Sequence, residues 1–239
     1  GDSISTKLLA RHPELVSTHV SEIGAIVSAA CLAHDLGNPP FGHSGEKAIA
    51  TYFSEGKGMV LKSQLSSMEW EDLTHFEGNA NAFRLLTHQF QGRRKGGFVM
   101  TYSTLASIVK YPFPSILAGK KPKFGFFTTE IDDYIKIAEE LGIKRLSQEG
   151  EPIKYARHPL VFLVEAADDI CYQMMDIEDA YKLKLLTPRE TKELYQLFLD
   201  EKKKERVDEV FSLVTDENEQ IAYLRATVIG ILVKECTQV

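Results

Sequence analysis

Apolar residues recur at helical spacing along most of the chain, and no long stretch alternates apolar and polar residues as a strand would. The clearest stripe lies within residues 20–36 and consists of Ile23, Ile26, Val27, Ala30 and Ala33. Similar patterns predict helices over 44–53, 79–88, 101–110, 130–142 and 159–184. Thr187 followed by Pro188 is typical of an N-cap and a first helical residue, so another helix is expected there. Together these patterns predict an all-α fold.

The composition excludes several classes of protein. A net charge of −6 over 239 residues gives no global basic footprint for nucleic acid. Three scattered cysteines without CxxC spacing indicate neither a disulfide framework nor a zinc knuckle, which favours a reducing, cytoplasmic location. No apolar run reaches the roughly 18 residues of a membrane-spanning helix, so we expect no membrane contact.

We expect a single helical domain over residues 1–239 that is incomplete at both ends. The chain begins without a methionine and ends in an apolar helical pattern, as part of a longer polypeptide would. Residues 92–128 are rich in glycine, proline and aromatic residues, which indicates an irregular connection. Within this segment we expect the helix at 101–110, followed by a long irregular stretch. Near the C-terminal end we expect missing sequence or another subunit to cover an apolar stripe of Ile221, Leu224, Val228 and Leu232.

The stripe within 20–36 ends in an adjacent histidine and aspartate, inside the segment CLAHDLGNPPFGHSGE. His34 falls on the buried stripe, where a lone histidine is usually a core residue bonded to a carbonyl. The neighbouring Asp35 favours another interpretation, because both side chains can converge on one ion at the end of a helix. An imidazole with a carboxylate suits a divalent metal that accepts nitrogen and oxygen ligands.

The helix predicted at 159–184 carries an acidic stripe with steps of 3, 4, 4 and 3 residues, formed by Glu165, Asp168, Tyr172, Asp176 and Asp179. Like charges at this spacing repel each other by about 0.2–0.5 kcal/mol per pair. A bound metal cation would relieve that repulsion. A solvated acidic face is the alternative, but an aromatic residue in its middle fits the wall of a pocket better.

A Pro-Pro turn precedes a second pair of polar residues, His43 and Glu46. A histidine three residues before a glutamate brings an imidazole and a carboxylate within hydrogen-bond reach, and such a pair can orient a general acid or base. Gly42 and Gly45 would let the backbone approach a ligand closely. A capping histidine is the alternative. Proximity to the His-Asp pair favours a catalytic role.

Four segments resemble, in order, the deoxyguanosinetriphosphate triphosphohydrolases, the dGTPase-like branch of the HD-domain superfamily. They are AACLAHDLGNPPFGHSGEKAI, HFEGNANAFRLL, STLASIVKYPF and EAADDICYQMMDIEDA. The resemblance is spread over residues 24–180, and the first segment joined to FEGNA is its most specific part. It implies a helical HD-domain fold and cleavage of a deoxynucleoside triphosphate (dNTP) to a deoxynucleoside and inorganic triphosphate.

The resemblance also implies a role for each matched residue. The implied metal ligands are His34, Asp35 and Asp168. The implied catalytic residues are His43, its acidic partner Glu46, and Glu77 beside the reacting phosphate. The implied substrate contacts are Asn79, Lys110, Tyr172 and Asp176. Further candidates to bind the triphosphate are Lys121 and Lys123, and a solvated lysine is the alternative for Lys110.

The family pattern begins with an upstream histidine in a segment similar to RLTHS, and no such segment occurs in this chain. His12 and His19 lie too near the His-Asp pair, in a stretch unlike that motif. We therefore expect the first metal ligand to be missing here and the other three to bind metal more weakly. The expected cofactor is a divalent metal, Mg²⁺ or Mn²⁺.

The expected reaction is metal-dependent hydrolysis at the α-phosphate, in which His43 protonates the leaving oxygen and Tyr172 excludes a 2′-hydroxyl. The alternatives are another HD-type phosphohydrolase, acting on a cyclic or alarmone nucleotide, and a non-catalytic regulator that binds nucleotide or single-stranded DNA. The intact His43 and Glu46 argue against the regulator. The expected partners are the dNTP substrate, further copies in a homo-oligomer, and an allosteric nucleotide or single-stranded DNA.

Overall fold

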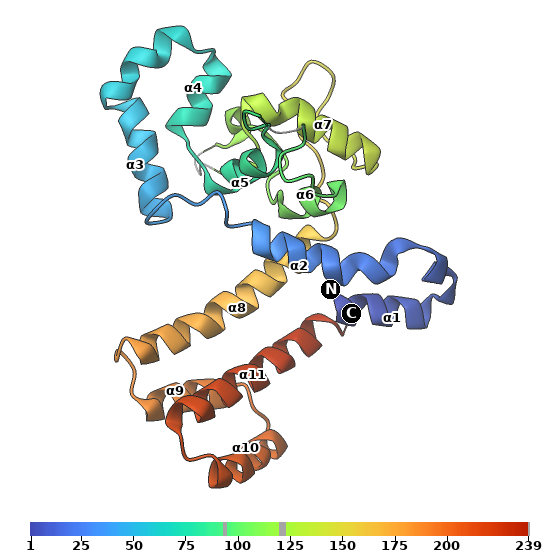
Figure 1. Cartoon of the computed structure of the whole chain (residues 1–239), viewed down its shortest axis with the longest axis vertical. Helices are drawn as coiled ribbons and strands as arrows, with labels where there is room; N and C mark the ends of the chain where they lie inside the picture. Colours follow the sequence, from blue (N-terminus) through green and yellow to red (C-terminus); the bar gives the residue numbers. More distant parts are fainter. Residues whose placement is uncertain (93–94, 120–122, 239) are drawn as a thin grey trace. The chain divides into compact units, whose positions relative to one another are not determined.

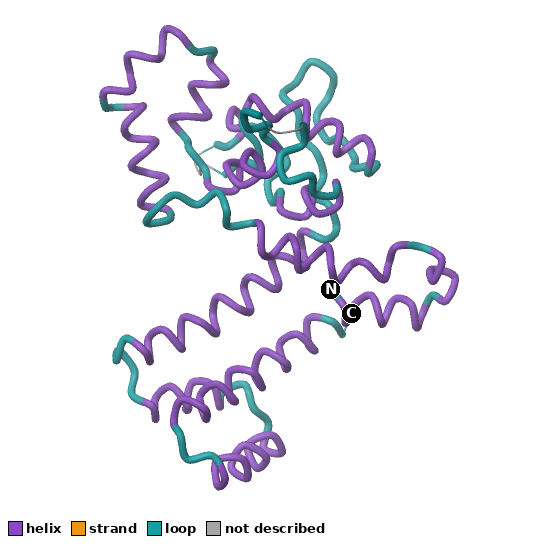
Figure 2. Tube along the Cα trace, viewed as in Figure 1, coloured by secondary structure: helices purple, strands orange, loops and turns teal. Residues whose placement is uncertain are grey.

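The computed structural model describes residues 1–92, 95–119 and 123–238, and no β-strand occurs in that part of the chain (Figures 1 and 2). Extended backbone pairs there only as two isolated bridges, Pro114 with Phe126 and Arg145 with Tyr155. The prediction of an all-α fold is confirmed.

The chain divides into two compact units, residues 1–164 and 165–239. The helices of the first unit are α1 (Asp2–Arg11), α2 (Ile23–Ala33), α3 (His43–Ser54), α4 (Ser67–Thr74), α5 (Gly78–Thr87), α6 (Tyr102–Ile108) and α7 (Ile131–Glu140). The first turn of α8 (Val161–Lys182) also belongs to it. The second unit holds the rest of α8 with α9 (Pro188–Gln196), α10 (Glu201–Leu213) and α11 (Glu217–Cys236).

Helix α2 carries the predicted apolar stripe. Val27, Ala30 and Ala33 are buried in the core of the first unit, and α2 packs on α6. The helix ends at Ala33, before the predicted limit, and residues 34–37 form a turn. Because the stripe is buried, the His-Asp pair lies at the edge of the core, directly after the end of α2.

Gly37 is the last residue of that turn, and its role differs from the helix stop that its place after the apolar stripe predicts. We expect Gly37 to stop the helix as its C′ residue. This is wrong, because the helix ends earlier and Gly37 does not have a positive φ. A Cβ atom on Gly37 would lie 2.1 Å from both the Gly78 carbonyl oxygen and the Ala82 nitrogen. The glycine is needed so that the backbone of α5 can pack directly on this turn.

Aromatic rings fill the centre of the first unit. Tyr134 of α7 stacks on Phe126 with ring centroids 4.6 Å apart and meets Phe83 edge-on at 5.8 Å. All three rings are fully buried. The Tyr134 hydroxyl has no hydrogen-bond partner among the described residues, and burial raises its pKa above the ordinary value. The ring stabilises this core, while its hydroxyl adds an unpaired polar atom.

Removing that hydroxyl should stabilise the protein. We expect Tyr134→Phe to raise the free energy of unfolding by about 1 kcal/mol, because an unpaired buried polar group is destabilising. Tyr195 is the matched control: it is equally buried, but its hydroxyl donates a 2.9 Å hydrogen bond to the Met174 carbonyl. Tyr195→Phe should lower the free energy of unfolding by about 1 kcal/mol. Urea unfolding curves measure both variants, and an equal loss of the free energy of unfolding in the two would contradict the prediction.

The second unit has its own apolar core. Its buried members are Met174, Tyr195, Leu199, Val207, Ile221, Leu224 and Val228. The expectation that the stripe on α11 needs a cover from outside the chain is therefore wrong for Ile221, Leu224 and Val228. These residues pack against α8 and α9 within the unit, and Leu232 packs against the same core.

Capping residues fix several helix starts. Thr187 and Glu190 form a capping box around Pro188 at the start of α9, which confirms the predicted helix start. Ser66 and Glu69 do the same for α4, a helix that apolar periodicity alone does not predict. In the part of the chain that the structure describes, no helix has the length and apolar character needed to cross a membrane.

Candidate active site

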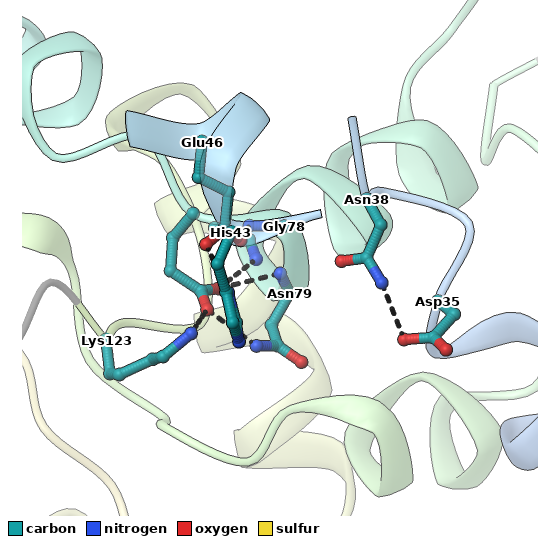
Figure 3. Close-up of polar contacts among 9 residues, drawn as sticks. Asp35, Asn38, His43, Glu46, Gly78, Asn79 and Lys123 are labelled. Carbon is teal, nitrogen blue, oxygen red and sulfur yellow. Dashed lines mark hydrogen bonds and ion pairs between the residues drawn. The ribbon is translucent and has the colours of Figure 1, made fainter. Parts of the chain in front are cut away.

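The His-Asp pair lies in the turn that follows α2. His34 Nδ1 is 2.7 Å from the Cys31 carbonyl oxygen, and since a carbonyl only accepts, Nδ1 carries the hydrogen. A neutral ring then has its lone pair on Nε2, which lies 3.4 Å from Asp35 Oδ1. The Asn38 amide donates to the same Asp35 oxygen at 2.9 Å and orients it (Figure 3).

This donor set fits a divalent metal. A ring nitrogen and a carboxylate oxygen face each other at close range, and each has an electron pair that a cation would attract. His34 is mostly buried and held by its second ring nitrogen, as metal-binding histidines commonly are. Within the described part of each unit, no group of three or more His, Cys, Asp and Glu side chains converges as a complete metal site.

The predicted residues after position 164 belong to the second unit. Asp168, Tyr172 and Asp176 lie on α8, where Asp168 is partly buried while Tyr172 and Asp176 are exposed. Tyr172 is 67% exposed. Their participation in one site with His34 and Asp35 stays a prediction.

His43 and Glu46 form the predicted pair in the first turn of α3. Phe41 and Gly42 both have a positive φ, of 65° and 53°, and this tight turn starts the helix at His43. Glu46 Oε2 lies 2.8 Å from His43 Nδ1, and Glu46 Oε1 accepts the Gly78 N–H at 2.7 Å. The histidine side chain is 85% exposed and the glutamate side chain 12%. A buried carboxylate therefore orients an exposed imidazole.

The FEGN motif builds the start of α5. Glu77 is fully buried and caps the helix, accepting from the backbone N–H groups of Asn79 at 2.7 Å and Ala80 at 3.3 Å. Its other oxygen accepts from the Asn79 side-chain amide at 2.7 Å and from Lys123 Nζ at 2.6 Å (Figure 3). This geometry favours an anchoring role for Glu77 over the catalytic role that the resemblance implies.

Residues of α3, the last residue of α4 and the segment after it line a cavity of about 360 Å³, together with Lys123. It is lined by His43, Glu46, Lys47, Ala50, Thr74, His75, Phe76 and Lys123. The structure thus brings together three predicted residues from distant parts of the sequence: His43, Glu46 and Lys123. Asn79 and Lys110 lie outside this lining, and Lys121 lies outside the described residues.

Two ionisable residues of the lining are absent from the sequence prediction, Lys47 and His75. His75 Nδ1 lies 3.0 Å from Glu71 Oε2, one helical turn earlier. The signal for His75 is its place directly before FEGN, and the signal for Lys47 is its place directly after Glu46. The Lys47 ammonium and the His75 ring add hydrogen-bonding groups to the wall of the cavity.

No protein-family model matches the chain. Two proteins named deoxyguanosinetriphosphate triphosphohydrolase-like protein are similar to it. One, from Pseudomonas aeruginosa, is 46% identical over 182 residues, which cover 73% of this chain and 39% of that protein. The other, from a Synechocystis strain, is 37% identical over 249 residues, which cover 100% of this chain and 54% of that protein.

A third similar protein, from Yersinia enterocolitica, is named deoxyguanosinetriphosphate triphosphohydrolase. It is 30% identical over 253 residues, which cover 90% of this chain and 48% of that protein. The chain spans about half the length of these relatives or less. On these similarities, the chain belongs to the deoxyguanosinetriphosphate triphosphohydrolase-like family.

Proposed function

We propose that the protein hydrolyses a deoxynucleoside triphosphate to the deoxynucleoside and inorganic triphosphate, and that dGTP or a related dNTP is the substrate. The observation that carries the proposal is the His43–Glu46 pair at the wall of a cavity that also holds an anchored lysine. An imidazole oriented by a carboxylate supplies acid–base chemistry, and a lysine supplies an anion contact. The names of the similar proteins support the choice of substrate class.

His43 would move the proton that the reaction needs. Its Nδ1–H is directed to Glu46, so Nε2 is the nitrogen that faces a ligand. A water molecule adds to the α-phosphorus while the bond from phosphorus to the deoxyribose O5′ breaks. In its imidazolium form His43 passes the proton on Nε2 to O5′, while the attacking water gives its proton to solvent as triphosphate forms. The ring is left as the neutral Nδ1–H imidazole, and a proton from solvent restores the imidazolium.

The metal would be held by His34, Asp35 and Asp168, with Mg²⁺ or Mn²⁺ as the ion. When bound, it would supply Lewis-acid polarisation of the α-phosphate. The fit of His34 Nε2 and Asp35 Oδ1 to a mixed nitrogen and oxygen site supports this assignment. Asn38 holds Asp35 in position through its side-chain amide.

Lys123 would bind a phosphate of the substrate. Its ammonium has three N–H donors, one of which goes to the buried Glu77, so two remain for phosphate oxygens. The ion pair at 2.6 Å also fixes the otherwise flexible side chain. We propose Asn79, Lys110, Tyr172 and Asp176 as further substrate contacts, as the resemblance implies, with Tyr172 beside the deoxyribose.

Loss of the Lys123 charge should weaken binding more than catalysis. We expect Lys123→Met to raise KM for the dNTP by roughly 10- to 100-fold, since a hydrogen bond to a charged group contributes about 1.5–3 kcal/mol. The steady-state KM and kcat of purified variants measure the effect. Lys123→Arg keeps the charge and should restore part of the affinity. Thermal unfolding of both variants separates lost binding from lost folding, because methionine leaves Glu77 buried without its counter-ion.

Lys47 provides the matched control. It lines the same cavity but makes no ion pair with any described residue. Lys47→Met should change KM less than about fivefold, in the range of an exposed charge interaction. A larger effect at Lys47 than at Lys123 would contradict the assignment of the phosphate contact.

The products of the reaction test the proposed function most directly. The purified protein is incubated with each dNTP and with GTP, in Mg²⁺ and in Mn²⁺, and the products are separated by ion-exchange chromatography. We expect deoxynucleoside and intact triphosphate in equal amounts, with little turnover of GTP. Pyrophosphate or orthophosphate as the first product would indicate another phosphohydrolase, and binding without turnover would indicate a regulator.

The setting of the reaction is also part of the proposal. We propose a cytoplasmic homo-oligomer whose further partners are an allosteric nucleotide or single-stranded DNA, as the family resemblance implies. Size-exclusion chromatography with light scattering, in the presence and absence of each partner, tests the assembly.

A further inference from the structure

The first turn of α5 satisfies its backbone donors in two different ways. The N–H groups of Asn79 and Ala80 go to the side chain of Glu77, which caps the same helix. The N–H of Gly78 instead goes to Glu46 Oε1 on α3, a residue 32 positions earlier. Gly78 is therefore the point at which the start of α5 contacts the proposed acid–base pair (Figure 3).

This contact fixes the orientation of the Glu46 carboxylate toward the histidine. A backbone N–H can only donate, so it requires an acceptor and takes Oε1. Oε2 is left to accept from His43 Nδ1 at 2.8 Å. Because the Glu46 side chain is largely buried, it has little freedom to rotate away. Because a carboxylate oxygen only accepts, the oxygen held against the ring places the hydrogen of the neutral His43 ring on Nδ1 and leaves Nε2 for the substrate.

The missing side chain of Gly78 is as important as its N–H. A Cβ atom at this position would lie 2.3 Å from Asn38 Oδ1 and 2.9 Å from Glu46 Oε1. Asn38 orients Asp35, and Glu46 orients His43. A glycine at position 78 therefore leaves room for the supports of both proposed functional pairs.

We propose that Gly78 is a positioning residue, which fixes the tautomer and direction of His43 by pinning Glu46 through its N–H and by leaving space for it. The inference rests on the proposed role of His43 in hydrolysis. Its test uses a readout on the histidine ring that does not require turnover. Absence of hydrolysis by the wild-type protein would count against the proposed function, while the ring signals would still test Gly78.

Glu46→Gln tests the pinning without adding bulk. The Gly78 N–H should take the amide oxygen, so the amide NH₂ group would face His43 Nδ1 and require an acceptor there. We expect the ring to change from the Nδ1–H to the Nε2–H tautomer. The ¹⁵N chemical shifts of the neutral ring report the tautomer, with signals assigned by comparison with His43→Gln. A folded Glu46→Gln protein that retains the Nδ1–H tautomer would overturn the proposal.

Gly78→Ala tests the need for space. We expect loss of the single Nδ1–H tautomer and a fall in kcat of about 10- to 100-fold, the scale of a lost support behind a site histidine, with KM little changed. Gly230→Ala is the matched control, because a Cβ on this helical glycine of α11 would meet no atom within 4 Å apart from the neighbouring backbone of its own helix. It should leave the ring signals and turnover unchanged. Wild-type ring signals in a folded Gly78→Ala protein would also overturn the proposal.

Discussion

Replacing His43 with alanine should lower kcat for dNTP hydrolysis by roughly 10²–10⁴-fold and leave KM nearly unchanged, the expected cost of losing a general acid. The side chain is exposed at the cavity wall, and its only described hydrogen bond holds it from behind through Glu46. Its substitution should therefore remove the proposed proton-transfer group without disturbing the fold. Steady-state kinetics on the purified variant, with circular dichroism to check folding, measure the effect.

The chain contains a close control for this substitution. His12 and Glu14 form an exposed histidine–glutamate pair at 3.1 Å, outside the lining of the cavity. His12→Ala removes a similar imidazole and should leave kcat within about twofold of the wild type, because a surface pair of this kind contributes little. An unchanged kcat with a raised KM in His43→Ala would instead assign His43 to substrate binding.

The sequence predicts the fold class and the His43–Glu46 pair because both depend on local spacing. Helical periodicity places Val27, Ala30 and Ala33 on one buried face whatever packs against them. In the same way, a histidine and a glutamate three residues apart meet wherever the first turn of a helix forms.

Local spacing does not predict contacts between residues that are far apart in the sequence. The pairing of Glu77 with Lys123 joins residues 46 positions apart, and nothing in their local spacing indicates it. The same holds for Gly37, whose lack of a side chain matters only because α5 packs on it. Periodicity also predicts an outside partner for the stripe on α11, because it reveals an apolar face but not the helices that cover it.

Removal of a proposed metal ligand should abolish both metal retention and turnover. We expect Asp168→Ala and Asp35→Ala each to lower kcat by roughly 10³-fold or more, because Lewis-acid catalysis at a phosphate contributes several kcal/mol. Both variants should also lose Mn²⁺, which electron paramagnetic resonance and elemental analysis measure independently of activity. Asp35 is exposed and Asp168 lies within a long helix, so neither substitution removes an apolar core residue.

The aspartate next to Asp168 makes the metal test specific. Asp169 is exposed on α8 and carries the same charge one position along the helix, about 100° around its axis. Asp169→Ala should keep its Mn²⁺ and its turnover, since a general loss of negative charge on α8 would affect both aspartates equally. If Asp168→Ala retains as much Mn²⁺ as the wild type, or if Asp169→Ala loses the ion in its place, then Asp168 is not the ligand. The acidic stripe of α8 would in that case be a solvated face, and the ion would be held without it.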